Sequence, residues 1–240
     1  MLYSWFIAIV IFFASVTSGT AGFGFALVSM PFISLVVSPK LAVPFIILYG
    51  YGINIFFLLF RFKEYVDWQK LLPLVWGALP GIPLGIYFLK NYDDVIIKKI
   101  VGGVVIVFAL SKLLVRVDRK NGLSRFWGYL AGFASGILSG GTSMGGPPVL
   151  MYLTLNRWGK TLTRATLQSF FVVVGTCSLL GLTIARLLTL SVLRLNILYL
   201  PAVVLGNAAG YLLFKRLSSE LFNRVLLCLL LVLGFLLVFA

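Results

Sequence analysis

Six long runs of apolar residues constrain the fold of this chain more than any other feature. About 20 residues of apolar helix are needed to cross the hydrocarbon core of a bilayer, and 61% of the whole chain is hydrophobic. The runs are continuous and do not alternate between apolar and polar residues, which excludes a transmembrane β-barrel. The sequence therefore predicts an all-α polytopic membrane protein, with spans at residues 42–60, 71–89, 95–115, 165–185, 192–214 and 221–240.

The charge pattern narrows the function classes. The net charge of +14 comes from 20 Lys and Arg residues against six acidic residues. The basic residues gather in short loops, as the positive-inside rule requires, and no basic stretch is long enough to follow a phosphate backbone. We therefore expect no nucleic-acid partner. The chain has no His, and Cys177 and Cys228 lie inside apolar runs, so we expect no metal and no cofactor. The apolar start lacks a basic residue before Lys40 and a good cleavage site, so we expect it to stay in the mature protein.

Two further apolar segments, residues 4–37 and 126–155, are interrupted. The first contains SGTAGFGFALVSMP (18–31) and the second SGGTSMGGPPVLMY (139–152). The first segment is far longer than one crossing needs. As two half-helices of about 13 residues, each arm would be roughly 20 Å long, enough to pass the midplane and return. We therefore expect two re-entrant helical hairpins.

The interrupted segments belong to an internal repeat. A shift of 121 residues aligns Ser18 with Ser139 and Gly24 with Gly145, and shifts of 123 and 125 continue the match through the later runs. Each repeat would hold one hairpin followed by three transmembrane helices. The expected parts are a first repeat at 1–115, a polar cytoplasmic linker at 116–123 and a second repeat at 124–240.

Loop charges support the hairpins. If each interrupted segment returns to the side from which it entered, fourteen of the Lys and Arg residues lie on one face of the membrane and six on the other. If each segment crosses once, the division is ten against ten, which is no bias at all. Three crossings per repeat place the second repeat upside down relative to the first, an architecture typical of secondary transporters. We expect a multi-pass protein of the plasma membrane with both termini on the non-cytoplasmic side.

The hairpin tips are the candidate substrate site. Irregular backbone at membrane depth must be satisfied by protein, ligand or water. Glycines let backbone N–H groups approach a ligand, and a helix that begins at a tip offers unpaired donors that favour a small anion. The alternative is tight helix packing through small residues. The candidate binding residues at the tips are Ser18, Gly19, Thr20, Gly22, Gly24, Ser139, Gly140, Gly141, Thr142, Ser143, Gly145 and Gly146.

The same residues carry a resemblance to a known family. GFGFALVSMP in the first half, and GGTSMGGPPVLMYL followed by RATLQSFF in the second, resemble the two signature regions of the TauE/SafE family of sulfite and organosulfonate transporters. The similarity extends over nearly the whole chain. It implies a permease for small sulfur oxyanions or related organic anions, often an exporter. The first tip departs from the family's glycine-richer form at Ala21 and Phe23.

Polar residues outside the tips have two interpretations. Gln168 and Ser169 follow the second hairpin and either line the substrate path or form interhelical hydrogen bonds. Arg164 lies at the cytoplasmic end of its span, where it either draws anions to the mouth or anchors the topology. All six acidic residues lie in loops or at span ends, so the coupling mode stays open between facilitated diffusion, exchange and ion coupling.

Two other function classes are alternatives to a transporter. An anion channel would use the same site without a conformational cycle. A membrane-embedded enzyme would need a nucleophile with a base, and the Ser and Thr residues of the second tip have no His, Lys or carboxylate partner nearby in the sequence. We therefore expect a transporter and no enzymatic activity.

Overall fold

The computed structural model describes residues 2–21, 23–114, 122–156, 158–214 and 219–239, and within these residues it contains helices and no strand. The prediction of an all-α protein is confirmed. The helices of the first half are α1 (Leu2–Ala21), α2 (Phe25–Val36), α3 (Pro39–Phe57), η1 (Leu58–Phe62), η2 (Lys63–Tyr65), α4 (Trp68–Asn91) and α5 (Asp94–Leu114). Those of the second half are α6 (Arg125–Thr142), α7 (Gly146–Leu155), α8 (Lys160–Ile184), α9 (Leu190–Phe214) and α10 (Ser219–Phe239).

Four of the described helical segments are long and apolar enough to cross a bilayer. They are Pro39–Tyr65, Trp68–Asn91, Thr161–Ile184 and Leu190–Leu212. The first of them continues α3 through the π-helical turn η1 and the short 3₁₀ turn η2. Helices α5 and α10 occupy the positions of the two remaining expected spans. Residues 116–121 of the expected linker at 116–123 lie outside the described residues.

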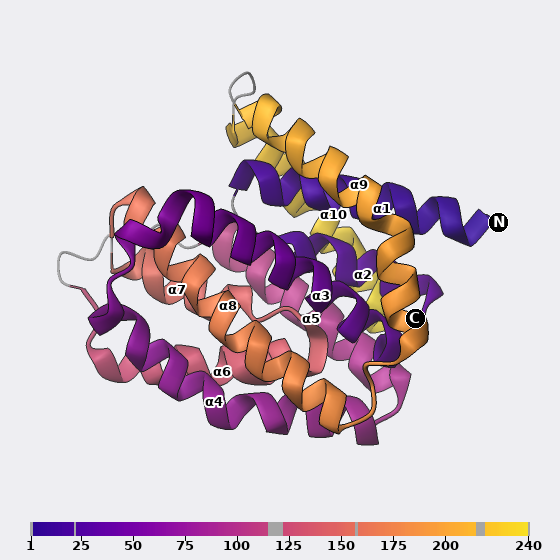
Figure 1. The fold of residues 1–240 in the computed structure, drawn as a ribbon, viewed down its shortest axis with the longest axis horizontal. Helices are drawn as coiled ribbons and strands as arrows, with labels where there is room; N and C mark the ends of the chain where they lie inside the picture. Colours follow the sequence, from indigo (N-terminus) through magenta and orange to yellow (C-terminus); the bar gives the residue numbers. More distant parts are fainter. Residues whose placement is uncertain (1, 22, 115–121, 157, 215–218, 240) are drawn as a thin grey trace.

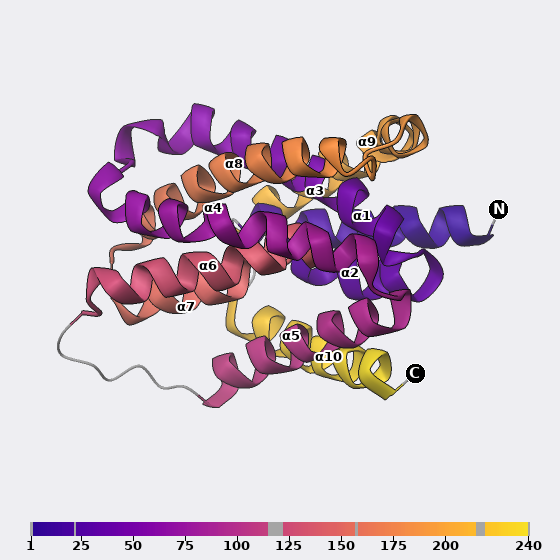
Figure 2. The same ribbon diagram turned by 90° about the horizontal axis from the view of Figure 1, so that it is seen from below.

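Both interrupted segments are helical hairpins. Helices α1 and α2 run in opposite directions, as do α6 and α7 (Figures 1 and 2). The first break contains Gly24 at φ 99°, and the second contains Ser143 at φ 59°. The expectation of arms of about 13 residues is wrong for the first arms, because α1 has 20 residues and α6 has 18, whereas α2 has 12 and α7 has 10. The small residues before each break remain helical.

Close packing of helix backbones explains why those residues stay helical. A Cβ added at Gly136 of α6 would lie 2.2 Å from the carbonyl oxygen of Ala78 in α4, and one at Gly210 of α9 would lie 2.3 Å from that of Val16 in α1. Because glycine has no side chain, the backbones of two membrane helices can approach closely enough to touch at these positions. The first arm of each hairpin is therefore held by a long helix from the other half, and tertiary packing overrides the low helix propensity of glycine.

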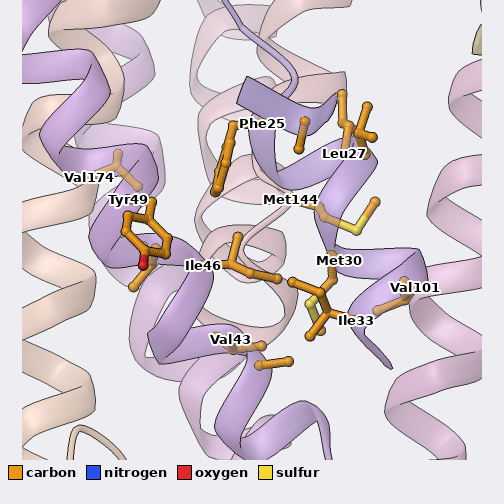
Figure 3. Packing of buried hydrophobic residues seen from close by; sticks show 14 of the residues in the cluster. Phe25, Leu27, Met30, Ile33, Val43, Ile46, Tyr49, Val101, Met144 and Val174 are labelled. Carbon is orange, nitrogen blue, oxygen red and sulfur yellow. The ribbon is translucent and has the colours of Figure 1, made fainter. Parts of the chain in front are cut away.

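The path of the chain brings the two tips together in the core. The N and C labels lie at one end of the molecule, whereas α5 ends and α6 begins toward the opposite end (Figures 1 and 2). Between these ends, Met144 of the second tip packs close to Leu27 and Met30 of α2, beside Ile46 of α3 (Figure 3). The hydrophobic core thus surrounds the region where the two hairpins meet.

Candidate functional site

A small cavity of about 80 Å³ lies where the two hairpin tips meet. Since a single water needs roughly 10–15 Å³, this volume can hold several waters or one small oxyanion. Helices α3 and α8 complete its wall. The lining residues include five that the sequence analysis selected, which are Ser18, Gly24, Ser139, Ser143 and Gly146.

At the first tip, the first turn of α2 lines this cavity. Gly24 adopts a left-handed conformation, which a glycine tolerates without strain. The first intrahelical bond of α2 runs from the Val28 N–H to the Gly24 carbonyl at 3.0 Å. No side chain caps this end of the helix, and Phe25, Ala26 and Leu27, whose N–H groups precede that bond, all line the cavity. The first turn of α2 therefore offers backbone donors together with the partial positive charge of a helix N-terminus.

The second tip is more firmly anchored and offers fewer donors. The Ser143 hydroxyl donates to the Val43 carbonyl of α3 at 2.8 Å, and the Ser135 hydroxyl donates to the Gly145 carbonyl. Helix α7 begins at Gly146 and continues with Pro147 and Pro148, which have no N–H to donate. The two tips therefore differ in character, and most of the backbone donors belong to the first.

Two hydroxyls at the cavity are unused. Ser18 of α1 and Ser139 of α6 are 3% and 5% exposed. Both line the cavity, and among the described residues neither hydroxyl forms a hydrogen bond. These two serines also occupy equivalent positions in the internal alignment. Each half thus contributes one buried hydroxyl that can donate to a ligand.

The remaining tip residues do not line the cavity, or lie outside the described residues. The Thr20 hydroxyl donates to the Thr17 carbonyl at 2.9 Å, and the Thr142 hydroxyl donates to the Leu138 carbonyl at 2.8 Å. Gly19 packs against the α9 backbone, and Gly140 and Gly141 pack against that of α4. A Cβ at Gly145 would collide with the Ser139 hydroxyl, only 1.9 Å away. Gly22 lies outside the described residues.

Of the three predicted α8 residues, Arg164 contacts the first tip. The Arg164 guanidinium donates to the Thr20 carbonyl at 3.3 Å, so it contacts the end of α1. Gln168 and Ser169 are buried on the same helix and do not line the cavity, although Phe171, one turn further along, does. Arg164 therefore reaches the first tip from the start of α8.

Some residues that line the cavity were not among the binding residues predicted from the sequence. Tyr51 of α3 lines the cavity, and its hydroxyl accepts a hydrogen bond from Thr176 of α8 at 3.1 Å. Phe23 and Phe171 add aromatic rings to the same wall, and Asn54 adds an amide. An aromatic residue in an apolar run gives no sign of whether it faces a cavity or lipid. Asn54 was identifiable as a polar residue within a span.

No acidic side chain lines the cavity in the described part of the chain. Asp67, between η2 and α4, caps α4 by accepting hydrogen bonds from the backbone N–H groups of Gln69 and Lys70. Its carboxylate also lies 2.8 Å from the Lys70 ammonium. The hydrogen bond with Lys70 lowers the pKa of Asp67, so this acid is ionised at neutral pH and has a structural role.

The fold and cavity define a class of protein, a polytopic helical membrane protein with two helical hairpins whose tips meet at a small cavity. A family model described as sulfite exporter TauE/SafE matches residues 7–237, and the chain belongs to this family of membrane transporters. No curated protein and no solved structure matches the chain.

Proposed function

We propose that this protein is a secondary transporter of small sulfur oxyanions, such as sulfite or simple organosulfonates, and that it binds them between the two hairpin tips. One observation carries the proposal: residues of both tips line one cavity, together with two unused hydroxyls and the start of α2. A hydrogen bond to a charged group contributes about 1.5–3 kcal/mol. Several such donors, with no acidic residue lining the cavity, favour an anion over a neutral or cationic solute.

The two halves form inverted repeats in this proposal. In the internal alignment α1 corresponds to α6 and α4 to α9, so the packing of α4 on α6 is equivalent to that of α9 on α1. Helix α3 corresponds to α8, and α5 corresponds to α10. Exchanging the two halves therefore leaves the α3–α8 and α5–α10 contacts unchanged. This reciprocal pattern supports a pseudo-two-fold relation. The loop charges favour an orientation in the plasma membrane with both termini outside the cytoplasm and the turn from residue 61 to residue 70 inside.

The transport cycle would expose the cavity to each side in turn. Helices α3 and α8 contribute wall residues from corresponding positions in the two repeats, so a relative movement of the repeats would open one wall and close the other. Tyr51 and Thr176 join these walls by their hydrogen bond. We propose that this bond breaks when the cavity opens on that side.

Uptake into proteoliposomes tests the function. Purified protein reconstituted in liposomes should move sulfite faster than empty liposomes do, with a rate that saturates as the sulfite concentration rises. Sulfate and methanesulfonate, measured in parallel, define the preferred substrate. A rate that rises linearly without saturation would favour an anion channel, and no flux of any of the three anions would contradict the proposal.

A further inference from the structure

A second hollow lies outside the substrate cavity, on the surface between α3, η1 and α9. It is a groove of about 660 Å³, and its lining is almost wholly apolar. Phe56 and Phe60 from one side and Leu200 and Val204 from the other each expose more than half of their surface. A Cβ added at Gly52, in the floor of the groove, would meet no other atom within 4 Å. The groove is therefore open space that a hydrophobic chain can fill.

One end of the groove carries a fixed positive charge. The Arg61 guanidinium lines that end and lies 4.5 Å from the centre of the Tyr211 ring. In the described part of the chain, the one ion pair is Lys70 with Asp67, and no carboxylate pairs with Arg61. Arg61 belongs to the π-helical turn η1, and π-helical turns are frequent at functional sites. Stacking on Tyr211 orients the guanidinium, whose N–H groups can bind phosphate oxygens bidentately.

The dimensions of the groove match one leaflet of a bilayer. Along α3 and η1 it extends from Leu48 to Arg61, a distance of roughly 20 Å at about 1.5 Å per residue. Half of a hydrocarbon core is about 15 Å thick, so an acyl chain lying in the groove would place its headgroup beside Arg61. The loop charges put this end on the cytoplasmic side, where membranes hold anionic lipids.

We propose that the α3–α9 groove is a binding site for an anionic phospholipid of the cytoplasmic leaflet. The acyl chain occupies the apolar groove, and the headgroup phosphate binds Arg61. Ile53 lines both this groove and the substrate cavity, so the bound lipid forms the outer support of one wall of the transport site. The proposal depends on the groove and its charge and does not require the substrate to be a sulfur oxyanion.

Native mass spectrometry of the full-length protein in detergent tests the site, with phosphatidylglycerol and phosphatidylcholine titrated separately. The parent should bind phosphatidylglycerol more tightly. Arg61→Gln should weaken phosphatidylglycerol binding about tenfold or more, as expected for a lost charge-assisted hydrogen bond. It should weaken phosphatidylcholine binding less, because the choline ammonium already offsets the charge of that phosphate. Gly52→Phe, which fills the groove, should weaken the binding of both lipids.

Matched controls separate the site from general effects. Lys63→Gln removes the same charge two residues further along and lies outside the groove. Gly103→Phe adds the same ring at another glycine with open space around it. Both should bind lipid like the parent. The proposal would be overturned if the parent bound the two lipids with equal affinity. It would also be overturned if Arg61→Gln, a change at an exposed position, left phosphatidylglycerol binding unchanged. The proposal would also be overturned if glycerol phosphate alone raised the melting temperature as much as phosphatidylglycerol does, and if this rise depended on Arg61. The site would then bind soluble anions.

Discussion

Removing the hydroxyls of Ser18 and Ser139 probes the transport site with little disturbance to the fold. Each hydroxyl is buried at the cavity and forms no hydrogen bond within the described residues, so a change to alanine breaks no internal bond. One hydrogen bond to a charged ligand contributes about 1.5–3 kcal/mol, which corresponds to roughly 10- to 100-fold in affinity. We expect Ser18→Ala and Ser139→Ala each to weaken sulfite binding by that factor. The double variant should lose measurable binding.

Isothermal titration of detergent-purified protein with sulfite measures these affinities, and thermal unfolding checks the fold. The matched control is Ser29→Ala. Ser29 is a buried serine of the first hairpin whose hydroxyl donates to the Phe25 carbonyl at 2.7 Å and which does not line the cavity. It should bind sulfite like the parent. If both cavity variants fold normally and bind sulfite as tightly as the parent, the anion does not contact these hydroxyls and the site assignment is wrong.

Three further predictions concern packing, topology and the acidic residues. Gly136→Leu should lower the melting temperature strongly, because the Leu Cβ would meet the Ala78 carbonyl and overpacking costs about 1–3 kcal/mol or more. The control Gly103→Leu should not lower it, because Gly103 has open space around it. Equal melting temperatures of the two variants would refute the packing argument. In a variant without Cys177 and Cys228, an impermeant thiol reagent should label Asn91→Cys from outside intact cells and should not label Asp67→Cys. The reverse pattern would refute the proposed sidedness. Asp67→Ala should cost about 0.5–2 kcal/mol of stability through the lost helix cap and retain sulfite flux, whereas a folded variant without flux would make this acid a coupling group. Because the folded-state pKa of Asp67 is lowered, the stability difference should be present at neutral pH and disappear as the pH falls through that value.

Much of the fold could be predicted from the sequence because bilayer thickness fixes the length of an apolar helix. The expected span at 71–89 lies within Trp68–Asn91, and that at 192–214 nearly matches Leu190–Phe214. The two breaks are also where glycine and proline suggested them. The arm lengths could not be predicted, because residues such as Gly140 have low helix propensity in isolation and become helical only through contact with a backbone distant in sequence.

The roles of the hydroxyl residues were equally hidden. Ser139 and Thr142 look alike in the sequence, yet Thr142 donates to the carbonyl of its own preceding turn and Ser139 lines the cavity. A hydroxyl in a helix can always form such a local bond, so only tertiary structure decides which residue faces a ligand. Arg164 illustrates the same limit, because its contact with Thr20 joins residues 144 positions apart.

The position of the bound anion tests the central claim most directly. Selenite has the shape and charge type of sulfite, and its selenium scatters anomalously, so crystals soaked with selenite can show where the anion binds. We expect one anomalous peak between the hairpin tips, within hydrogen-bond distance of Ser18, Ser139 and the start of α2. A peak elsewhere, for example beside Arg61, with none between the tips would contradict it.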